Sequence, residues 1–178
     1  PFMGIMAVAP PPGGGMTSSR PPGMFGGNLD LKQLTRGATL YLPVYNNGAL
    51  FYTGDAHTAQ GDGEVDGTAI ETSLKPTLQF IVHKGKGKGM VAPRAENATH
   101  WIVTGLDRDL NLALKNAVQA AVDFLMQEKG LDAGAAYALA SIAVDFRVAE
   151  AVNLVQGVYG MIPKNIFKEQ KGEYWFKQ

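Results

Sequence analysis

The segment from Gly54 to Glu71 holds the densest group of side chains in the chain that could do chemistry. On an extended backbone Asp55 and His57 point to the same side, because side chains in a strand alternate with period two. A carboxylate and an imidazole placed in this way could hold one divalent cation such as zinc. The cation would lower the pKa of a bound water to about 7 and so provide a nucleophile without a serine or a cysteine.

Three more acids follow in the same segment, since Asp62, Glu64 and Asp66 alternate and glycines between them allow tight bends. They could act as a general base or orient a metal ligand through a hydrogen bond. Acids at the first, third and fifth places with Gly67 at the sixth also resemble the start of a calcium loop. Ser73 stands where an EF-hand needs a bidentate glutamate, so only a calcium-binding turn of another kind stays open.

The composition points to a partner that is small and neutral. Sixteen basic residues balance sixteen acidic ones among 178 residues, so no overall field draws the chain to nucleic acid or to an anionic membrane. The absence of cysteine excludes disulfides, thiolate nucleophiles and cysteine-bound metals. No apolar run approaches the roughly 20 residues that span a bilayer, and no signal-peptide pattern opens the chain. We therefore expect a cytoplasmic protein without membrane or nucleic-acid partners.

The first half of the chain has mostly strand and loop patterns. The chain opens with Pro1 and the apolar run 2–9, a strand already under way, so we expect an upstream part that was removed or forms a separate chain. Residues 10–27 are rich in proline and glycine, which predicts a long loop, either a plain surface loop or an active-site lid. The runs 39–45 and 49–52 flank an Asn-Gly pair and predict a hairpin. Further strands are expected at 68–72, 77–83 and 100–104.

Lysine and glycine alternate from Lys84 to Gly89. This run lacks the spacing of a Walker phosphate loop and no helix pattern follows it, so it predicts a solvated hairpin tip. Phosphate or nucleic-acid binding is the alternative, although no aromatic stacking platform lies nearby. His83 and His100 lie at the edges of expected strands and are interpreted as structural.

Helix patterns come late in the chain. Asp107 or Asp109 can cap a helix that ends at Gly130, with an expected buried face of Leu110, Leu114, Val118, Val122 and Leu125. A second helix follows from Asp132, and then come strand-like runs at 144–148 and 158–163. Residues 1–106 are thus mostly β and residues 107–178 mixed. The pattern predicts an α+β fold, in which two late helices pack on one side of an antiparallel, β-rich sheet or barrel-like part.

Several strings in fixed order resemble the acetamidase/formamidase family. They are Gly26–Asp30, Gly37–Val44, Gly48–Phe51, Gly54–Glu64, Gly67–Glu71, Glu128–Leu131 and Ile162–Phe167. The resemblance covers nearly all of the chain but does not include the family's N-terminal part, a β-rich domain that contributes to the same active site. It therefore implies that residues 1–178 are the C-terminal catalytic portion of such an enzyme and that a companion N-terminal segment completes it.

The resemblance also implies an activity and a set of site residues. The activity is hydrolysis of formamide, acetamide or a similar short amide to ammonia and the carboxylic acid. The cofactor is a divalent metal ion, with zinc expected and calcium as the alternative. The implied metal ligands are His57, Asp55 and Asp30, the implied catalytic carboxylates are Glu64, Glu71 and Asp62, and the implied substrate-binding residues are Asn28 and Gln60.

Two further points remain open at this stage. A catalytically silent relative, which binds a metal or a small ligand without turning it over, is the alternative to the amidase. The apolar content, 46% of the residues, is high for a chain of this size and favours a homo-oligomer.

Overall fold

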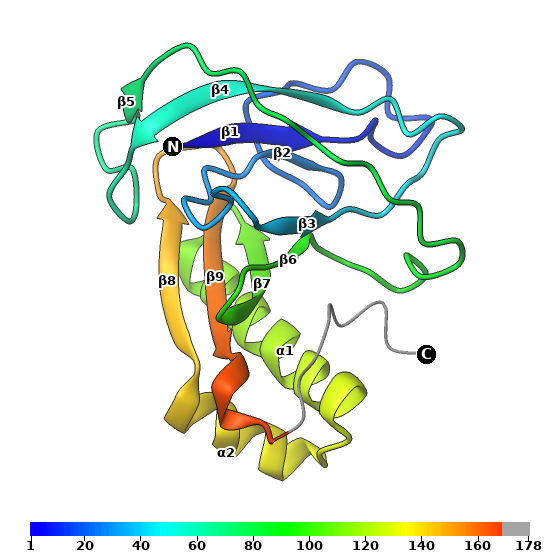
Figure 1. The fold of residues 1–178 in the computed structure, drawn as a ribbon, viewed down its shortest axis with the longest axis vertical. Coiled ribbons are helices and arrows are strands. Elements are labelled where there is room, and N and C mark those ends of the chain that lie inside the picture. Colours follow the sequence, from blue (N-terminus) through cyan, green and yellow to red (C-terminus); the bar gives the residue numbers. More distant parts are fainter. Residues whose placement is uncertain (169–178) are drawn as a thin grey trace.

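The computed structural model describes residues 1–168, which form two antiparallel sheets and two helices (Figure 1). One sheet has four strands in the order β2-β1-β4-β5, and the other has five in the order β3-β6-β7-β9-β8. The α+β class with two late helices is thereby confirmed, although the strands form two sheets. The elements are β1 (Phe2–Ala7), β2 (Gly26–Asn28), β3 (Thr39–Tyr41), β4 (Tyr52–Ala59), β5 (Ile70–Glu71), β6 (Arg94–Glu96), β7 (His100–Asp107), α1 (Leu110–Lys129), α2 (Ala133–Ala143), β8 (Asp145–Glu150), β9 (Gln156–Pro163) and the 3-10 turn η1 (Lys164–Ile166).

Strand β1 lies in the middle of the four-stranded sheet. It pairs with β2 on one side and with β4 on the other, and five of its six residues are buried. The apolar run at the start of the chain is therefore a strand, as predicted. Both of its neighbours come from within this chain, because β2 and β4 supply the ladder hydrogen bonds that an apolar strand would otherwise lack.

Helix α1 begins and ends where its capping residues predict. The Asp109 carboxylate accepts hydrogen bonds from the backbone N–H groups of Asn111 and Leu112, at 2.8 and 3.0 Å. Gly130 ends the helix in the left-handed conformation, with φ of 67°. Asp132 caps α2 in the same manner, through the N–H of Ala135 at 2.8 Å. Aspartate caps therefore mark both helix starts.

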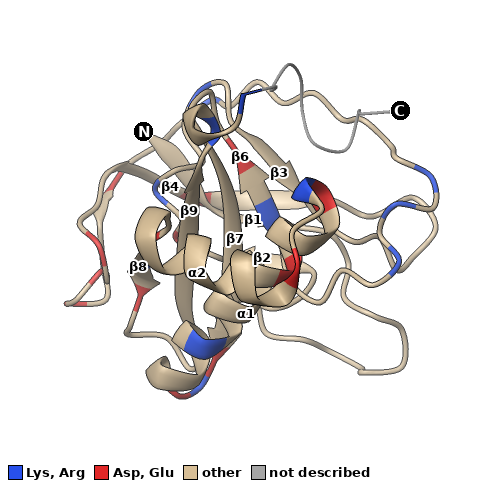
Figure 2. Cartoon of the chain, turned by 90° about the horizontal axis from the view of Figure 1, so that it is seen from below, with Lys and Arg blue, Asp and Glu red and all other residues tan. Residues whose placement is uncertain are grey.

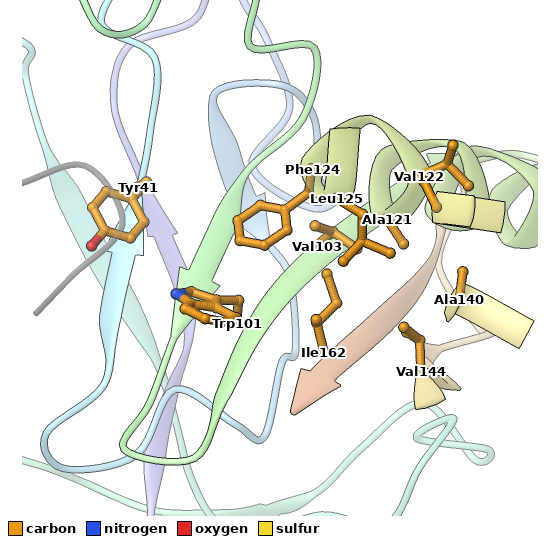
Figure 3. Close-up of a cluster of buried hydrophobic side chains, with 11 residues drawn as sticks. Tyr41, Trp101, Val103, Ala121, Val122, Phe124, Leu125, Ala140, Val144 and Ile162 are labelled. Atoms are coloured by element: carbon orange, nitrogen blue, oxygen red, sulfur yellow. The ribbon is translucent and has the colours of Figure 1, made fainter. Parts of the chain in front are cut away.

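The buried face of α1 differs from the predicted one. Val122 and Leu125 are buried as expected, but Leu114 is 41% exposed, and Leu110 and Val118 are only half-buried. The helix instead presents small residues to the five-stranded sheet, and this lets it lie close to β7. Phe124 and Leu125 pack toward Val103 of β7 and Ile162 of β9 (Figure 3). The buried residues of the helix are Ala113, Ala117, Ala121, Val122, Phe124 and Leu125.

Replacing Gly105 by alanine is expected to destabilise the protein by about 3 kcal/mol or more, since overpacked cores lose about 1–3 kcal/mol and occasionally more. A Cβ at Gly105 would collide with the backbone of Ala113 and Ala117 in α1, which cannot move aside as a side chain could. Urea unfolding measures the loss. Gly14→Ala is the matched control, because nothing lies within 4 Å of a Cβ there. Equal stability of the two variants would contradict the close packing of α1 on β7.

One predicted hairpin and two predicted strands differ from the structure. The hairpin expected from 39–45 and 49–52 does not form, because β3 pairs with β6 in one sheet while β4 pairs with β1 in the other. Ala49 and Leu50 both adopt positive φ, at 56° and 53°, and the chain crosses between the sheets there. Among residues 1–168 the 77–83 run has no strand partner, and only Ile70–Glu71 of the 68–72 run forms a strand, β5. Period-two patterns could not reveal which strand pairs with which.

The two loops with unusual composition are exposed. Residues 11–20 carry no helix or strand and are all exposed, which confirms the predicted loop there. The 84–89 run consists of turns and is exposed, but the expected flanking strand before it is missing. Lysine and arginine are spread over several elements together with acidic residues (Figure 2). No helix among residues 1–168 has the length and apolar character to cross a membrane.

Candidate metal centre

The imidazole of His57 is fully buried near the end of β4, with 0% of the residue exposed. Phe2 lies opposite it in the β1–β4 ladder, and the two rings make an edge contact with their centroids 5.1 Å apart. A histidine among glycines and acids suggests an exposed ligand, and the burial corrects that expectation. Burial makes an unpaired ring nitrogen costly, so the two nitrogens of His57 need partners.

Gln60 determines which nitrogen of His57 carries the proton. Its side-chain NH2 donates to the backbone carbonyls of Asp30 and Ala149, at 2.8 and 3.2 Å. Its carbonyl oxygen therefore faces His57, 2.9 Å from Nδ1. Because that oxygen can only accept, Nδ1 must be the protonated nitrogen. The lone pair of neutral His57 is then on Nε2.

Nε2 of His57 faces two carboxylates. Asp55 Oδ1 lies 3.2 Å from it and Glu71 Oε1 lies 3.7 Å from it, and Glu71 is opposite His57 in the β4–β5 ladder. Nε2 nevertheless has no hydrogen-bond partner. One ligand atom from each of these three residues falls within 4.8 Å of the others. A buried lone pair beside two carboxylate oxygens fits a divalent cation such as zinc.

Gly4 lies between the two aspartates of the site. Its carbonyl accepts from the N–H groups of Leu29 and Asp30, at 3.1 and 3.2 Å, and its neighbours in β1 pair with the residues on either side of Asp55. A methyl group at Gly4 would lie 2.5 Å from Asp30 Oδ1 and 2.8 Å from Asp55 Oδ2. Only glycine leaves the space that these two oxygens share. The central strand thus places both carboxylates.

Three acids of the site have an unusual backbone. Asp30, Asp55 and Glu64 adopt positive φ, at 43°, 58° and 42°, and they are three of the five non-glycine residues with positive φ among the described residues. This region is unfavourable for most side chains and persists where the surrounding structure imposes it. The backbone of Asp55 departs from the extended conformation within β4. Simple alternation along an extended strand therefore does not explain its contact with His57.

The second sheet contributes to the site through the end of β8. The N–H of Gly63 donates to the carbonyl of Val148 at 3.0 Å, and Gly63 in turn accepts from Ala151 at 3.0 Å. This docks the turn that carries Glu64 onto the connection from β8 to β9, which lies beside the end of β4 (Figure 1). Glu150, at the end of β8, is 0% exposed and one of its oxygens has no hydrogen-bond partner.

Burial raises the pKa of every acid in the interior of the site. Desolvation and the neighbouring charges of Glu64 and Asp55 raise the pKa of Asp30 to about 7. Desolvation raises the pKa of Glu150 to about 8, against the opposing effect of the Asn153 backbone N–H. The pKa values of Asp55 and Glu64 are also raised, mainly by burial. These groups resist ionisation as long as no cation is beside them.

The imidazole is the main positive counterpart in this region. Burial lowers the pKa of His57, but the hydrogen bond with Gln60 and the carboxylates of Asp55 and Asp30 raise it, and the net effect is upward. Five acids surround the ring: Asp30, Asp55, Glu64, Glu71 and Glu150. Within residues 1–168 none of them forms an ion pair with a lysine or an arginine. An excess of buried acid over buried base is typical of a cation site.

Two other predicted residues lie apart from this group. Asp62 forms an ion pair with Lys32 at 2.9 Å and accepts a hydrogen bond from the hydroxyl of Tyr159 at 2.9 Å. Asp66 accepts from the N–H of Thr68 at 3.2 Å. The segment that carries Asp62, Glu64 and Asp66 turns where a strand would have kept them on one face, so the three carboxylates diverge.

Asn28, by contrast, reaches the cluster. Its side-chain NH2 donates to Asp30 Oδ2 at 2.7 Å, and Asn153 donates to the same oxygen at 3.4 Å. Asp30 Oδ1 keeps no hydrogen-bond partner. An open hollow of about 530 Å³ lies beside Gln60, lined by Ala59, Gln60, Gly61, Asp66, Thr68, Ala69 and Ile70.

Sequence reasoning missed Gly4, Glu150 and Asn153. Gly4 is a glycine inside an apolar strand, which signals a close approach of other atoms to the backbone. Glu150 follows the strand-like run 144–148 and is flanked by apolar residues, so its burial could have been suspected. Nothing in the sequence links it to His57, which lies on a strand of the other sheet.

Replacing Gln60 by leucine is expected to release the tautomer of His57 and to weaken zinc binding by about 10–100-fold, as is usual when a group that orients a ligand is lost. Nitrogen-15 NMR of the imidazole, recorded on metal-free protein, reports the tautomer independently of activity. Gln60→Glu should keep Nδ1 protonated, because a carboxylate still accepts from it. Gln119→Leu on the exposed face of α1 is the control. An unchanged His57 spectrum in Gln60→Leu would contradict the role given to Gln60.

Comparison with known proteins supports the resemblance seen in the sequence. The sequence profile of the Acetamidase/Formamidase family matches residues 15–169. An acetamidase of Mycolicibacterium smegmatis is 48% identical over 46 residues, which are 26% of this chain and 11% of that protein. A formamidase of Methylophilus methylotrophus is 49% identical over 45 residues, 25% of this chain and 11% of that one.

The fold is also similar to a solved structure of the same family. The crystal structure of an acetamidase from Yersinia enterocolitica superposes with a TM-score of 0.78 at 29% identity, and the match covers 93% of this chain and 49% of that chain. The present chain thus spans about half the length of this relative. With a profile match over most of its residues and a shared fold, the chain belongs to the Acetamidase/Formamidase family.

Proposed function

We propose that this protein is a metal-dependent amidase that hydrolyses short linear amides, such as formamide and acetamide, to ammonia and the carboxylic acid. Family membership and the names of the similar proteins support the substrate class. The observation that carries the metal dependence is the buried Nε2 of His57, which has no hydrogen-bond partner and faces the carboxylates of Asp55 and Glu71.

His57, Asp55 and Glu71 are the proposed ligands. Because Gln60 keeps the proton on Nδ1, the lone pair of Nε2 is available on the side of the ring where the two carboxylates lie. An imidazole with carboxylates favours zinc over calcium, since calcium prefers oxygen ligands alone. A zinc ion held by these residues would act as a Lewis acid toward the amide carbonyl and lower the pKa of a water.

Buried carboxyl groups of the same cluster are the proposed proton carriers. Glu64 is 7% exposed and Asp30 1% exposed. Burial raises the pKa of Glu64, and burial together with the neighbouring acids raises the pKa of Asp30 to about 7. An acid that keeps its proton near neutral pH can deliver it to the departing amine, which must leave as ammonia. Asp62 is already engaged by Lys32 and by the Tyr159 hydroxyl of β9, so we infer that it has a structural role and takes no part in the reaction.

The two residues expected to bind substrate are given different roles. Both ends of the Gln60 amide are occupied, by His57 and by two backbone carbonyls, so we infer that it orients His57. Asn28 donates one hydrogen bond to Asp30 and holds that carboxylate in place. The open hollow along Gln60 and Ile70 is the proposed approach for the amide.

We further propose that this chain is the C-terminal catalytic portion of its family's enzyme and works with a companion segment or with a second copy. The matched structure is about twice as long as this chain. An extended segment after β5 exposes apolar side chains and pairs with no strand of the described residues. A surface of this kind favours coverage by another chain. The exposed apolar residues are Leu74, Leu78, Phe80, Ile81 and Val82.

Ammonia release from formamide and acetamide tests the proposed function. The protein is assayed as purified, after removal of metal with a chelator, and after zinc is returned. We expect activity that disappears with the chelator and returns with zinc. Metal binding without ammonia release from either amide, also when the companion segment is supplied, would favour the catalytically silent relative instead. Activity that persists in metal-free protein would overturn the metal dependence.

A further inference from the structure

We propose that the outer face of α2 is an interface between two copies of this chain, which meet as an antiparallel pair of α2 helices. The inference goes beyond the proposed function, because this face lies away from the candidate metal centre. In Figure 1 α2 lies at the bottom of the molecule, whereas β4, which carries His57 near its end, lies at the top. Two copies joined through α2 would leave both candidate centres open to substrate.

The sequence of α2 is typical of a buried helix. Its eleven residues, from Ala133 to Ala143, include no charged side chain. α1, by contrast, carries lysine, aspartate and glutamate, as a surface helix usually does (Figure 2). A helix that is apolar on all sides is normally covered on all sides. The surface position of α2 therefore leaves one side of it without the cover that its composition predicts.

Only the inner side of α2 is covered within residues 1–168. Ala136 and Ala140 are buried in the core cluster to which α1 also contributes. The two large apolar side chains of the outer side, Tyr137 and Ile142, are 64% and 82% exposed. An exposed apolar patch of this kind marks an interaction surface. Burying it removes apolar surface from water, which drives association.

The shape of the outer face is complementary to itself. With about 3.6 residues per turn, small residues form a strip along the middle of this face, with Tyr137 on one side and Ile142 on the other. The small residues are Gly134, Ala138 and Ser141. When two copies meet about a two-fold axis, the large side chains of one helix lie over the small ones of its partner. A second copy of the chain thus supplies the matching surface.

The charges of α2 also favour a second copy. Two identical faces without charged residues meet without like-charge repulsion. No acidic residue lies in the first turn of α2 and no basic residue in its last turn, so only the N-cap Asp132 compensates the helix dipole. In an antiparallel pair the positive N-terminal end of one helix lies beside the negative C-terminal end of the other, which compensates both. The exposed segment that follows β5 starts at the opposite end of the molecule and stays available to the companion segment (Figure 1).

Sedimentation equilibrium of the whole chain over a series of concentrations tests this inference. We expect a reversible dimer. Ile142→Lys should weaken it at least about 100-fold, because an unpaired ammonium group would be buried in the interface. Val91→Lys is the matched control, since Val91 is 76% exposed on another part of the surface and its replacement should leave the dimer intact. Circular dichroism checks that both variants fold.

A cysteine at the middle of α2 gives a second measurement. The chain has no cysteine, so Ala138→Cys introduces a single thiol close to the two-fold axis of the proposed pair. Mild oxidation should link most of this variant into a disulfide dimer, because the two thiols would lie within bonding reach. Ser19→Cys, in the exposed loop 11–20, should stay unlinked at the same concentration.

Three results would each overturn the α2 interface. They are a chain that stays monomeric, a dimer that Ile142→Lys leaves intact, and an Ala138→Cys protein that is linked no more than Ser19→Cys. Ammonia release is measured separately, since α2 lies far from His57 and a lack of activity bears on the proposed function alone.

Discussion

Replacing His57 by alanine is expected to lower ammonia release from formamide by at least about 10³-fold, equivalent to about 4 kcal/mol of transition-state stabilisation. The imidazole supplies the only nitrogen ligand that the described residues offer in the cluster. Because the ring is buried against Phe2, the same change should also cost about 2 kcal/mol of stability through the cavity it leaves. The assay is steady-state ammonia release, with zinc in excess and folding checked by circular dichroism.

A second substitution separates the loss of a ligand from the loss of packing. His57→Gln keeps most of the side-chain volume, and it should be nearly as inactive as His57→Ala while closer to the unaltered protein in stability. His100→Ala is the matched control, since His100 contacts Thr99 and lies in the other sheet. A folded His57→Gln protein that retains most of its activity would remove His57 from the metal site.

Replacing Glu150 by glutamine should abolish much of the pH dependence of stability in metal-free protein. The pKa of Glu150 is about 8 in the folded protein, against an ordinary value of 4.5. The folded state therefore binds the proton more tightly than the unfolded chain, and stability must fall as pH rises from about 4.5 to about 8. Glutamine mimics the protonated form at every pH. Glu150→Gln should match the unaltered protein at pH 4 and exceed its stability by about 2–4 kcal/mol at pH 8.5.

Urea unfolding at a series of pH values, in the presence of a chelator, measures this difference. Asp30 has a raised pKa of about 7 and should leave a residual slope in the variant between about pH 4 and pH 7. Glu128→Gln on α1 is the control and should show the slope of the unaltered protein. A variant that is less stable at pH 8.5 would mean that the Glu150 charge is stabilised in the folded state, contrary to its burial.

The two helices show how much of the structure the local sequence predicts. Asp109 and Gly130 define the two ends of α1 through hydrogen bonds and backbone conformation that involve only neighbouring residues. Its buried face could not be predicted as well. Apolar periodicity pointed to Leu114, whereas contact with β7 selects small residues such as Ala113 and Ala117. The size of the facing residue, Gly105, decides this, and Gly105 is not part of the helix pattern.

The candidate site was likewise predictable from the sequence only in part. Asp55, His57 and Glu64 lie within one short segment, so their residue types and spacing, together with the family resemblance, indicated the site directly. Gly4 and Glu150 join them only through the tertiary structure, whereas Asp30 was indicated by the family resemblance and is brought close by the fold. Ladder pairing on both sides of β1 brings in Asp30, and the docking of Gly63 on β8 brings in Glu150. Strand pairing between distant segments depends on the whole fold, and a local sequence pattern does not record it.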